Sequence, residues 1–222
     1  MEEYRVLEIK QSVFADNDRE ADAVREGLKA RGQYLLNLMS SPGSGKTTTL
    51  SRTIEALAPE LKLAVMEADI DSDVDAATIA RLGAKTIQLH TGGMCHLDAG
   101  MCQQGLDGLA ASDADLIFLE NVGNLVCPAE FDTGACKNAC ILSVPEGDDK
   151  PLKYPGIFQH AGAQLLNKVD VAAAFDFDMN LYNETLDGLN PTAPRFSVSA
   201  RKGEGMDAWC DWLAQQIESA RN

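Results

Sequence analysis

One glycine- and serine-rich segment has the residue types and spacing that hold a polyphosphate. It runs Ser40-Ser41-Pro42-Gly43-Ser44-Gly45-Lys46-Thr47-Thr48, between an apolar strand and a helix. Its two glycines let backbone N–H groups approach phosphate oxygens with no Cβ in the way. The Lys46 ammonium adds charge near the outer phosphates, and the Thr47 hydroxyl is a ligand suited to Mg²⁺. The segment therefore predicts a phosphate-binding loop, with Ser40 replacing the usual first glycine.

A second segment, Asn167-Lys168-Val169-Asp170, has the residue types that read guanine. The Asp170 carboxylate can accept hydrogen bonds from guanine N1–H and the exocyclic amine, whereas adenine would leave it buried and unpaired. The alkyl stem of Lys168 can cover the face of the ring, and Asn167 can hold the loop and the N7 side. Backbone N–H groups at Ser199 and Ala200 are candidates for contact with guanine O6. The two segments together predict binding of GTP and GDP.

Acidic residues at the ends of two expected strands predict a magnesium region. Glu120 and Gly123 stand where proteins of this kind carry an Asp-x-x-Gly motif. A carboxylate there can orient Mg²⁺-bound water, and the Gly123 N–H can sense the γ-phosphate. Asp69 and Asp75 are further candidates beside Thr47. With Asn124 after Gly123 and no obvious arginine finger, the sequence predicts a GTPase of slow turnover whose catalytic residues are Lys46, Thr47, Glu120 and Gly123.

A thiol and imidazole constellation comprises Cys95, His96 and Cys127. Adjacent side chains on a strand point to opposite faces, but a bend at Gly92-Gly93 removes that restriction. Thiolate and imidazole suit Zn²⁺, Ni²⁺ or Cu better than Mg²⁺. Two interpretations are open, a metal site or ordinary core cysteines with a structural histidine. Three ligands leave a site incomplete, and a two-fold dimer could complete it.

The remaining elements predict a doubly wound α/β fold with a mostly parallel sheet flanked by helices, as in P-loop NTPase domains. Helices are expected at 18–31, 47–57, 75–82, 98–109 and 206–219. Strands are expected at Leu35–Met39, Leu63–Glu67, Thr86–Leu89, Leu116–Glu120, Ala139–Val144, Gln164–Asn167 and Phe196–Val198. We expect residues 1–33 to form a helical extension packed on the domain. Residues 34–222 are expected to form the GTP-binding domain, with the metal site embedded in it.

The charge balance of 19 Lys and Arg against 34 Asp and Glu gives a net charge of −15, which disfavours nucleic acid and anionic membranes. No apolar run reaches the length of a membrane span, and the first residues do not resemble an export signal. A cytoplasmic location is therefore expected. In that setting the six cysteines are thiols, metal ligands or core residues rather than a disulfide framework.

Four segments resemble the HypB-type GTPases, which help insert nickel into [NiFe] hydrogenases: 37–47, 91–97, 120–128 and 167–170. The resemblance implies a GTP-hydrolysing metallochaperone that forms a homodimer when GTP is bound. It also implies a nickel or zinc site at the dimer interface, built from Cys95, His96 and Cys127. The implied partners are a HypA-like nickel chaperone and the hydrogenase large-subunit precursor.

The sequence also departs from that family and leaves alternatives open. Residues 1–33 contain neither Cys nor His, unlike the nickel-holding N-terminal segment of many relatives. Lys150 and Lys153 either reach across a dimer to nucleotide or belong to a solvated loop. Competing functions are a metal-binding or storage module with regulatory nucleotide binding, a small-molecule kinase, and a urease-type nickel GTPase. The urease family places its metal motif in one Cys-Pro-His tripeptide, which this chain lacks.

Overall fold

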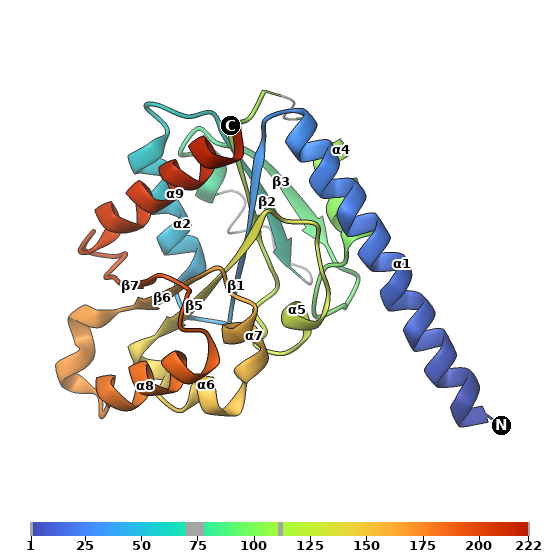
Figure 1. Ribbon diagram of the computed structural model, residues 1–222. Helices are drawn as coiled ribbons and strands as arrows, with labels where there is room; N and C mark the ends of the chain where they lie inside the picture. The colour runs from blue at the N-terminus through green and yellow to red at the C-terminus, as the bar shows by residue number, and fades with distance from the viewer. Residues whose placement is uncertain (1, 70–77, 111–112, 222) are drawn as a thin grey trace.

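The computed structural model describes residues 2–69, 78–110 and 113–221, with side chains from Asp16 onward. Its centre is a sheet of seven parallel strands in the order β3-β2-β4-β1-β5-β6-β7 (Figure 1). The strands are β1 Tyr34–Ser40, β2 Leu63–Asp69, β3 Lys85–His90, β4 Leu116–Glu120, β5 Lys137–Ser143, β6 Ala163–Asn167 and β7 Arg195–Ser197. The predicted doubly wound α/β fold is confirmed.

The central strands are buried along their whole length because helices cover both faces of the sheet. Successive residues of a strand point to opposite faces, so the apolar run of β4 divides between two cores. Leu116 and Phe118 pack in the cluster with helices α2 (Lys46–Leu57) and α9 (Met206–Arg221). Ile117 and Leu119 pack in the cluster with helices α1 (Glu2–Ala30) and α4 (Ala99–Leu109).

Shorter elements complete the carboxyl edge and the β6–β7 end of the domain. They are α5 Cys127–Glu130, η1 Val144–Glu146, α6 Lys150–Lys153, α7 Pro155–Gln159, η2 Val169–Ala174 and α8 Met179–Leu189. Helix α8 was not predicted, although the Asp178 carboxylate caps it by accepting from the N–H groups of Asn180 and Leu181. Of the helices in the described part of the chain, none has the length and apolar character that crossing a bilayer requires.

Several predicted boundaries are corrected by the structure. Helix α1 begins at Glu2, well before residue 18, and β5 ends at Ser143 because Pro145 has no N–H for a strand ladder. Strand β7 ends at Ser197, one residue before its predicted end. In the helix predicted for 75–82, residues 78–80 are helical and 81–83 form a turn, while 75–77 lie outside the described residues.

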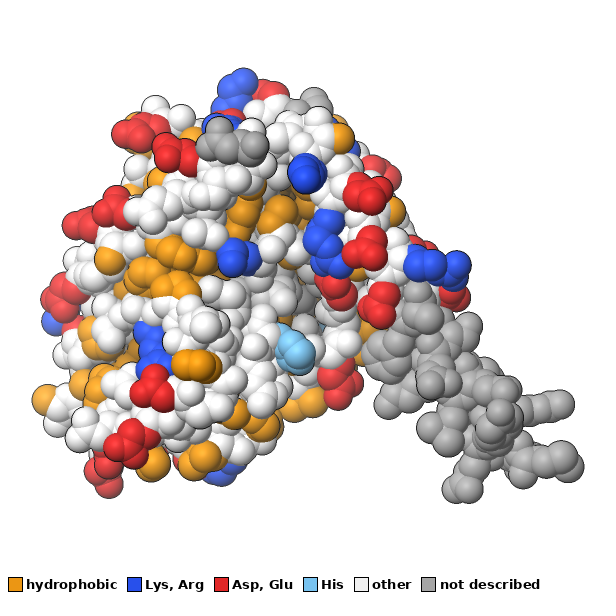
Figure 2. All heavy atoms as spheres, viewed as in Figure 1, with side chains coloured by type: hydrophobic (Ala, Val, Ile, Leu, Met, Phe, Trp, Pro, Cys, Tyr) orange, Lys and Arg blue, Asp and Glu red, His pale blue; other side chains and the backbone are white. Residues whose placement is uncertain are grey.

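Helix α1 is fixed to the domain by the face that the sequence predicted. Ala21, Val24 and Leu28 are buried, and the latter two belong to the apolar cluster beneath α4. Gly134, with φ of +77°, fits against this face, since a Cβ there would lie 2.5 Å from Val24 Cβ. On the face shown in Figure 2, charged side chains of both signs lie along the described part of α1. The division of the chain at residue 33 stays a prediction.

Gly134→Ala tests this docking. A methyl group there adds both left-handed backbone strain and a clash with Val24, so the free energy of unfolding should fall by about 3 kcal/mol. Gly32→Ala is the matched control, because Gly32 has φ of +64° with open space around it. It should cost about 1 kcal/mol, from the backbone alone. Urea denaturation measures both variants, and equal losses would contradict the packing argument.

Candidate nucleotide and metal site

The phosphate loop joins the end of β1 to the start of α2, as the sequence predicted. Gly45 precedes α2 with φ of 96° and ψ of 32°, a left-handed conformation that favours glycine. A Cβ on Gly45 would lie 2.5 Å from Asn167 Nδ2. Glycine is therefore required at this position for two reasons, the backbone turn and the close approach of the other nucleotide loop.

Ser40, which replaces the usual first glycine of the loop, is hydrogen-bonded to two other residues of the loop. Lys46 Nζ donates to Ser40 Oγ at 3.0 Å, and Ser44 Oγ donates to the same oxygen at 2.7 Å. Ser40 and Ser44 are fully buried. Their hydroxyls hold the ammonium group over the loop, where a phosphate would meet it.

The two nucleotide loops are bonded to each other. Asn167 Nδ2 donates to the Ser44 carbonyl at 3.0 Å, and Lys168 Nζ donates to the Gly43 carbonyl at 2.6 Å. Between them lies a pocket of about 480 Å³. Its lining consists of Gly45, Thr48, Asn167, Lys168, Asp170, Val171, Ser199 and Arg201. The structure therefore brings most of the predicted nucleotide residues into one pocket.

The Asn167 side chain also holds the third loop of the pocket. Its Oδ1 atom accepts from the N–H groups of Lys168 at 2.8 Å and Ala200 at 3.1 Å. The Ala200 N–H, which the sequence suggested for guanine O6, is thus directed at Asn167 in this structure. Lys168 takes a left-handed φ of 61°, which turns the chain between Asn167 and Asp170.

Asp170 lies in the pocket with 13% of its side chain exposed and Lys202 Nζ 3.6 Å from Oδ2. The nearby Ser199 hydroxyl, followed by the charge of Lys202, lowers the pKa of Asp170 below its usual value. The side chain is therefore an ionised acceptor at neutral pH, the form that guanine requires. The sequence analysis did not identify Lys202, because its pairing with Asp170 depends on how the β7 loop folds back.

Buried carboxylates stand beside the phosphate loop. Thr47 Oγ1 donates to Glu120 Oε1 at 2.9 Å, and Glu120 is 2% exposed. Glu67, at 3% exposure, is its direct partner in the parallel register of β2 and β4. By strand alternation Glu67, Asp69 and Glu120 point to the face that α2 covers. Hydroxyl and carboxylate oxygens on one face fit a divalent cation that prefers oxygen.

Glu67 is a candidate that sequence reasoning missed as a site residue. Its position opposite Glu120 depends on the pairing of β2 with β4, which are not consecutive in the chain. Asp75, the other predicted magnesium residue, lies outside the described residues.

The thiol and imidazole side chains predicted for metal binding do come together. One donor atom from each of Cys95, His96 and Cys127 lies within 4.8 Å of the others. The two sulfurs are 2.8 Å apart, and Cys95 Sγ is 3.8 Å from His96 Nδ1. The expected bend is present, with φ of 63° at Gly92 and 95° at Gly93. This donor set of two sulfurs and one nitrogen fits a soft or borderline ion.

The surroundings favour the metal-binding form of His96 and, without an ion, the protonated form of Cys127. Burial lowers the pKa of His96, so the imidazole is neutral at pH 7, and its ring stacks on Phe131 with centroids 3.8 Å apart. A hydrogen bond with Cys95 raises the pKa of Cys127 because it stabilises the thiol, and burial and the repulsion between two adjacent thiolates act in the same direction. A bound cation would relieve that repulsion.

A short segment connects the phosphate loop to the Cys127 sulfur. A Cβ on Gly123 would lie 3.1 Å from Pro42, so these two loops are in close contact. The next residue, Asn124, accepts through Oδ1 from the N–H groups of Val126 at 2.7 Å and Cys127 at 3.2 Å. Asn124 Nδ2 also lies 3.5 Å from Cys127 Sγ.

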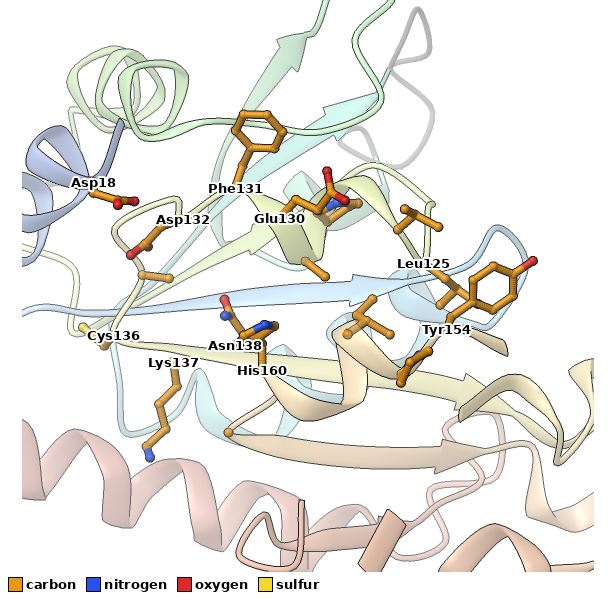
Figure 3. Close-up of a pocket in the computed structure, with 18 of the residues that line it drawn as sticks. Asp18, Leu125, Glu130, Phe131, Asp132, Cys136, Lys137, Asn138, Tyr154 and His160 are labelled. Atoms are coloured by element: carbon orange, nitrogen blue, oxygen red, sulfur yellow. The ribbon is translucent and has the colours of Figure 1, made fainter. Parts of the chain in front are cut away.

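Other groups lie apart from these sites. Of the cysteines outside the metal cluster, Cys102, Cys140 and Cys210 are buried and Cys136 is half-buried. Lys153 pairs with Asp149, and Lys150 lies 5.9 Å above the Tyr154 ring. A hollow of about 870 Å³ between α1, α5 and α7 borders the metal cluster at Phe131, and its lining includes His160, Cys136 and Asn138 (Figure 3).

Comparison with known proteins agrees with this geometry. Residues 35–197 match the family model for the CobW/HypB/UreG nucleotide-binding domain. Hydrogenase maturation factor HypB of Azotobacter chroococcum mcd 1 is 47% identical over 212 residues, which cover 96% of this chain and 70% of that protein. Hydrogenase maturation factor HypB of Escherichia coli (strain K12) is 45% identical, and the match covers 97% of this chain and 74% of that protein.

A solved structure, that of HypB from Helicobacter pylori in complex with nickel, has the same fold. It is 37% identical, covers 93% of this chain and 97% of its own, and gives a TM-score of 0.88. With the matched motifs in place around one sheet edge, the chain belongs to the HypB family of P-loop nucleotide-binding proteins.

Proposed function

We propose that this protein is a GTP-hydrolysing metallochaperone that couples its nucleotide state to nickel delivery during [NiFe]-hydrogenase maturation. The observation that carries the proposal is the bonded pair of nucleotide loops beside a connected thiol and imidazole cluster. Membership of the HypB family supports it, as does the nickel complex of the Helicobacter pylori relative.

In this proposal the pocket of about 480 Å³ receives the guanine base. Asp170 accepts from guanine N1–H and the exocyclic amine, and the Lys168 stem covers one face of the ring. Backbone N–H groups from Gly43 to Thr48 surround the phosphates, and Lys46 leaves Ser40 to contact the outer ones. Ser199 and Ala200 close the opposite side of the base.

Thr47, Glu120 and Asp69 would hold Mg²⁺, with Asp75 as a further proposed ligand. The ion would neutralise charge that develops on the phosphate oxygens during hydrolysis. Glu120 accepts from Thr47 and so fixes the hydroxyl that faces the ion. Gly123 offers its N–H to the γ-phosphate. We expect slow turnover, because Asn124 follows Gly123 where faster enzymes carry a water-orienting glutamine.

Cys95, His96 and Cys127 would bind the transported ion, Ni²⁺ or Zn²⁺. Since three donors leave the coordination sphere incomplete, a homodimer formed with GTP would complete it. Lys150 and Lys153 are proposed to lie near that interface. The proposed partners are a HypA-like nickel chaperone and the hydrogenase large-subunit precursor, all in the cytoplasm, with no membrane or nucleic acid involved.

The different-class alternative is a metal-binding or storage module in which nucleotide binding regulates and turnover is negligible. A urease-type nickel GTPase is not favoured, because the relatives at 45–47% identity are hydrogenase maturation factors. Phosphate release with GTP and with ATP, each with and without Ni²⁺, separates these functions. We expect slow release that is specific for GTP and responds to nickel. Release no faster than that of a Lys46→Ala control would favour the storage module.

Asp170→Asn tests the base assignment. The amide would present an N–H₂ group to guanine donors, so GTP affinity should fall by about 100-fold. Affinity for xanthosine triphosphate should rise, because xanthine has a carbonyl where guanine has the amine. Titration with fluorescent nucleotide analogues measures both. Asp176→Asn, on the exposed loop before α8, is the matched control, and an unchanged base preference in Asp170→Asn would reject the assignment.

Cys95→Ala tests the metal assignment. It removes one of two adjacent sulfurs, so stoichiometric nickel binding should be lost while GTP affinity stays within twofold of the unaltered protein, to within roughly 0.4 kcal/mol. Cys210→Ala, which removes a buried thiol on α9, should keep both. Nickel retained one-to-one by Cys95→Ala in equilibrium dialysis would show that the ion binds elsewhere.

A further inference from the structure

One side chain of helix α1 contacts both segments that carry the candidate metal ligands. Asn17, which is 6% exposed, donates through Nδ2 to the Asp132 carbonyl at 2.9 Å. Its Oδ1 atom accepts from the Ala99 N–H, also at 2.9 Å. Ala99 stands three positions after His96, and Asp132 stands five positions after Cys127. Asn17 therefore bridges the two segments just beyond their ligands.

The hydrogen bond from Ala99 to Asn17 supplies an acceptor to a backbone N–H at the start of α4. Ala99 is the first residue of α4, so its N–H has no acceptor within the helix. The cap residue Asp98 uses its carboxylate on the Met101 N–H, at 2.8 Å. Ala99 is fully buried, which keeps solvent from replacing the Asn17 oxygen. The bridge thus fixes the start of α4 to helix α1.

The Asp132 end of the bridge is reinforced by Arg25. The two terminal guanidinium nitrogens of Arg25 donate to the two Asp132 carboxylate oxygens at 2.9 and 2.8 Å. Such a two-point contact fixes orientation as well as distance. Helix α1 therefore holds Asp132 by both its carbonyl and its carboxylate.

Asp132 follows Phe131, which contacts the candidate metal ligand His96 directly. In Figure 3, Asp132 lies near Asp18 of helix α1, and Phe131 lies beside Asp132 at the edge of the hollow. Phe131 stacks on the His96 ring with an interplanar angle of 16°. The position of Asp132 consequently sets the surface against which the imidazole rests.

We propose that Asn17 is a positioning residue for the metal site, and that Arg25 assists it. Helix α1 would hold the Cys95-His96 segment and the Cys127 segment at the separation that lets three donor atoms share one ion. This inference rests on the proposed function of Cys95, His96 and Cys127 as ligands. Helix α1 would then affect metal affinity by holding the ligand segments, without itself binding the metal.

Asn17→Ala tests the inference in the full chain with Ni²⁺ as the probe. Loss of an outer contact of this kind should weaken nickel binding about 10-fold, with the thiolate-to-nickel absorption band shifted or reduced. GTP affinity should stay unchanged. Arg25→Gln, which removes the reinforcing contact at a half-exposed site, should weaken nickel binding by a smaller factor and serves if Asn17→Ala does not fold.

Asn190→Ala is the matched control for a purely structural effect. Asn190 is also an asparagine that binds distant carbonyls, those of Phe158, Gln159 and Ala161, but it lies at the end of α8. It should lower the unfolding midpoint and leave nickel affinity and the absorption band unchanged. Equal nickel loss in Asn17→Ala and Asn190→Ala would overturn the inference. So would unaltered nickel affinity in folded Asn17→Ala or, if that variant does not fold, in Arg25→Gln. If Cys95→Ala keeps its nickel, the proposed ligand set itself is wrong, whatever Asn17 does.

Discussion

The nucleotide site depends on the buried amide of Asn167. This one side chain is bonded to the phosphate loop at Ser44, to its own loop at Lys168 and to the β7 loop at Ala200. Because the amide is 2% exposed, water does not compete for these contacts. Gly45 is the complementary requirement, since any side chain there would occupy the space of the amide. Three loops that are distant in sequence thus form one pocket.

The parallel sheet places charge where the nucleotide needs it. The parallel strands end at the same edge of the sheet, so Ser40, Glu120 and Asn167 end their strands there, and Glu67 lies two residues before the end of β2. Two buried carboxylates in register repel each other unless a donor or a cation lies between them. Thr47 supplies one donor to Glu120. The repulsion between these two carboxylates is unfavourable when no cation is present. The same pair of carboxylates makes this edge of the sheet suited to a metal-bound triphosphate.

The sequence predicted the parts of the site that have a local motif. It did not predict the contacts between residues that lie far apart in the chain. The phosphate loop, the Asn167 loop and the Cys95 bend each have glycines or polar residues at fixed spacing, and the fold follows from buried strands. The Glu67 and Glu120 pair, the Lys202 contact and the Asn17 bridge have no local signal, because each joins elements distant in the chain. The seven-stranded order itself could not be read from the sequence.

In the proposed coupling, the segment from the end of β4 to Cys127 connects the nucleotide site to the metal site. Asn121 is held at its N–H by the Leu38 carbonyl and at its side chain by Asn37, which in turn donates to Asn138. This chain of amides connects the end of β4 to β1 and, through β1, to β5. Beyond it, Gly123 touches Pro42, and Val126 is 47% exposed. Movement driven by the γ-phosphate would therefore concentrate between Val122 and Cys127. The sulfur of Cys127 stands at the end of that interval, whereas helix α1 holds the next few residues in place. In the proposed coupling, the Cys127 sulfur therefore stands between a segment that would move with the nucleotide and one that helix α1 holds, where a small displacement would change the metal geometry most.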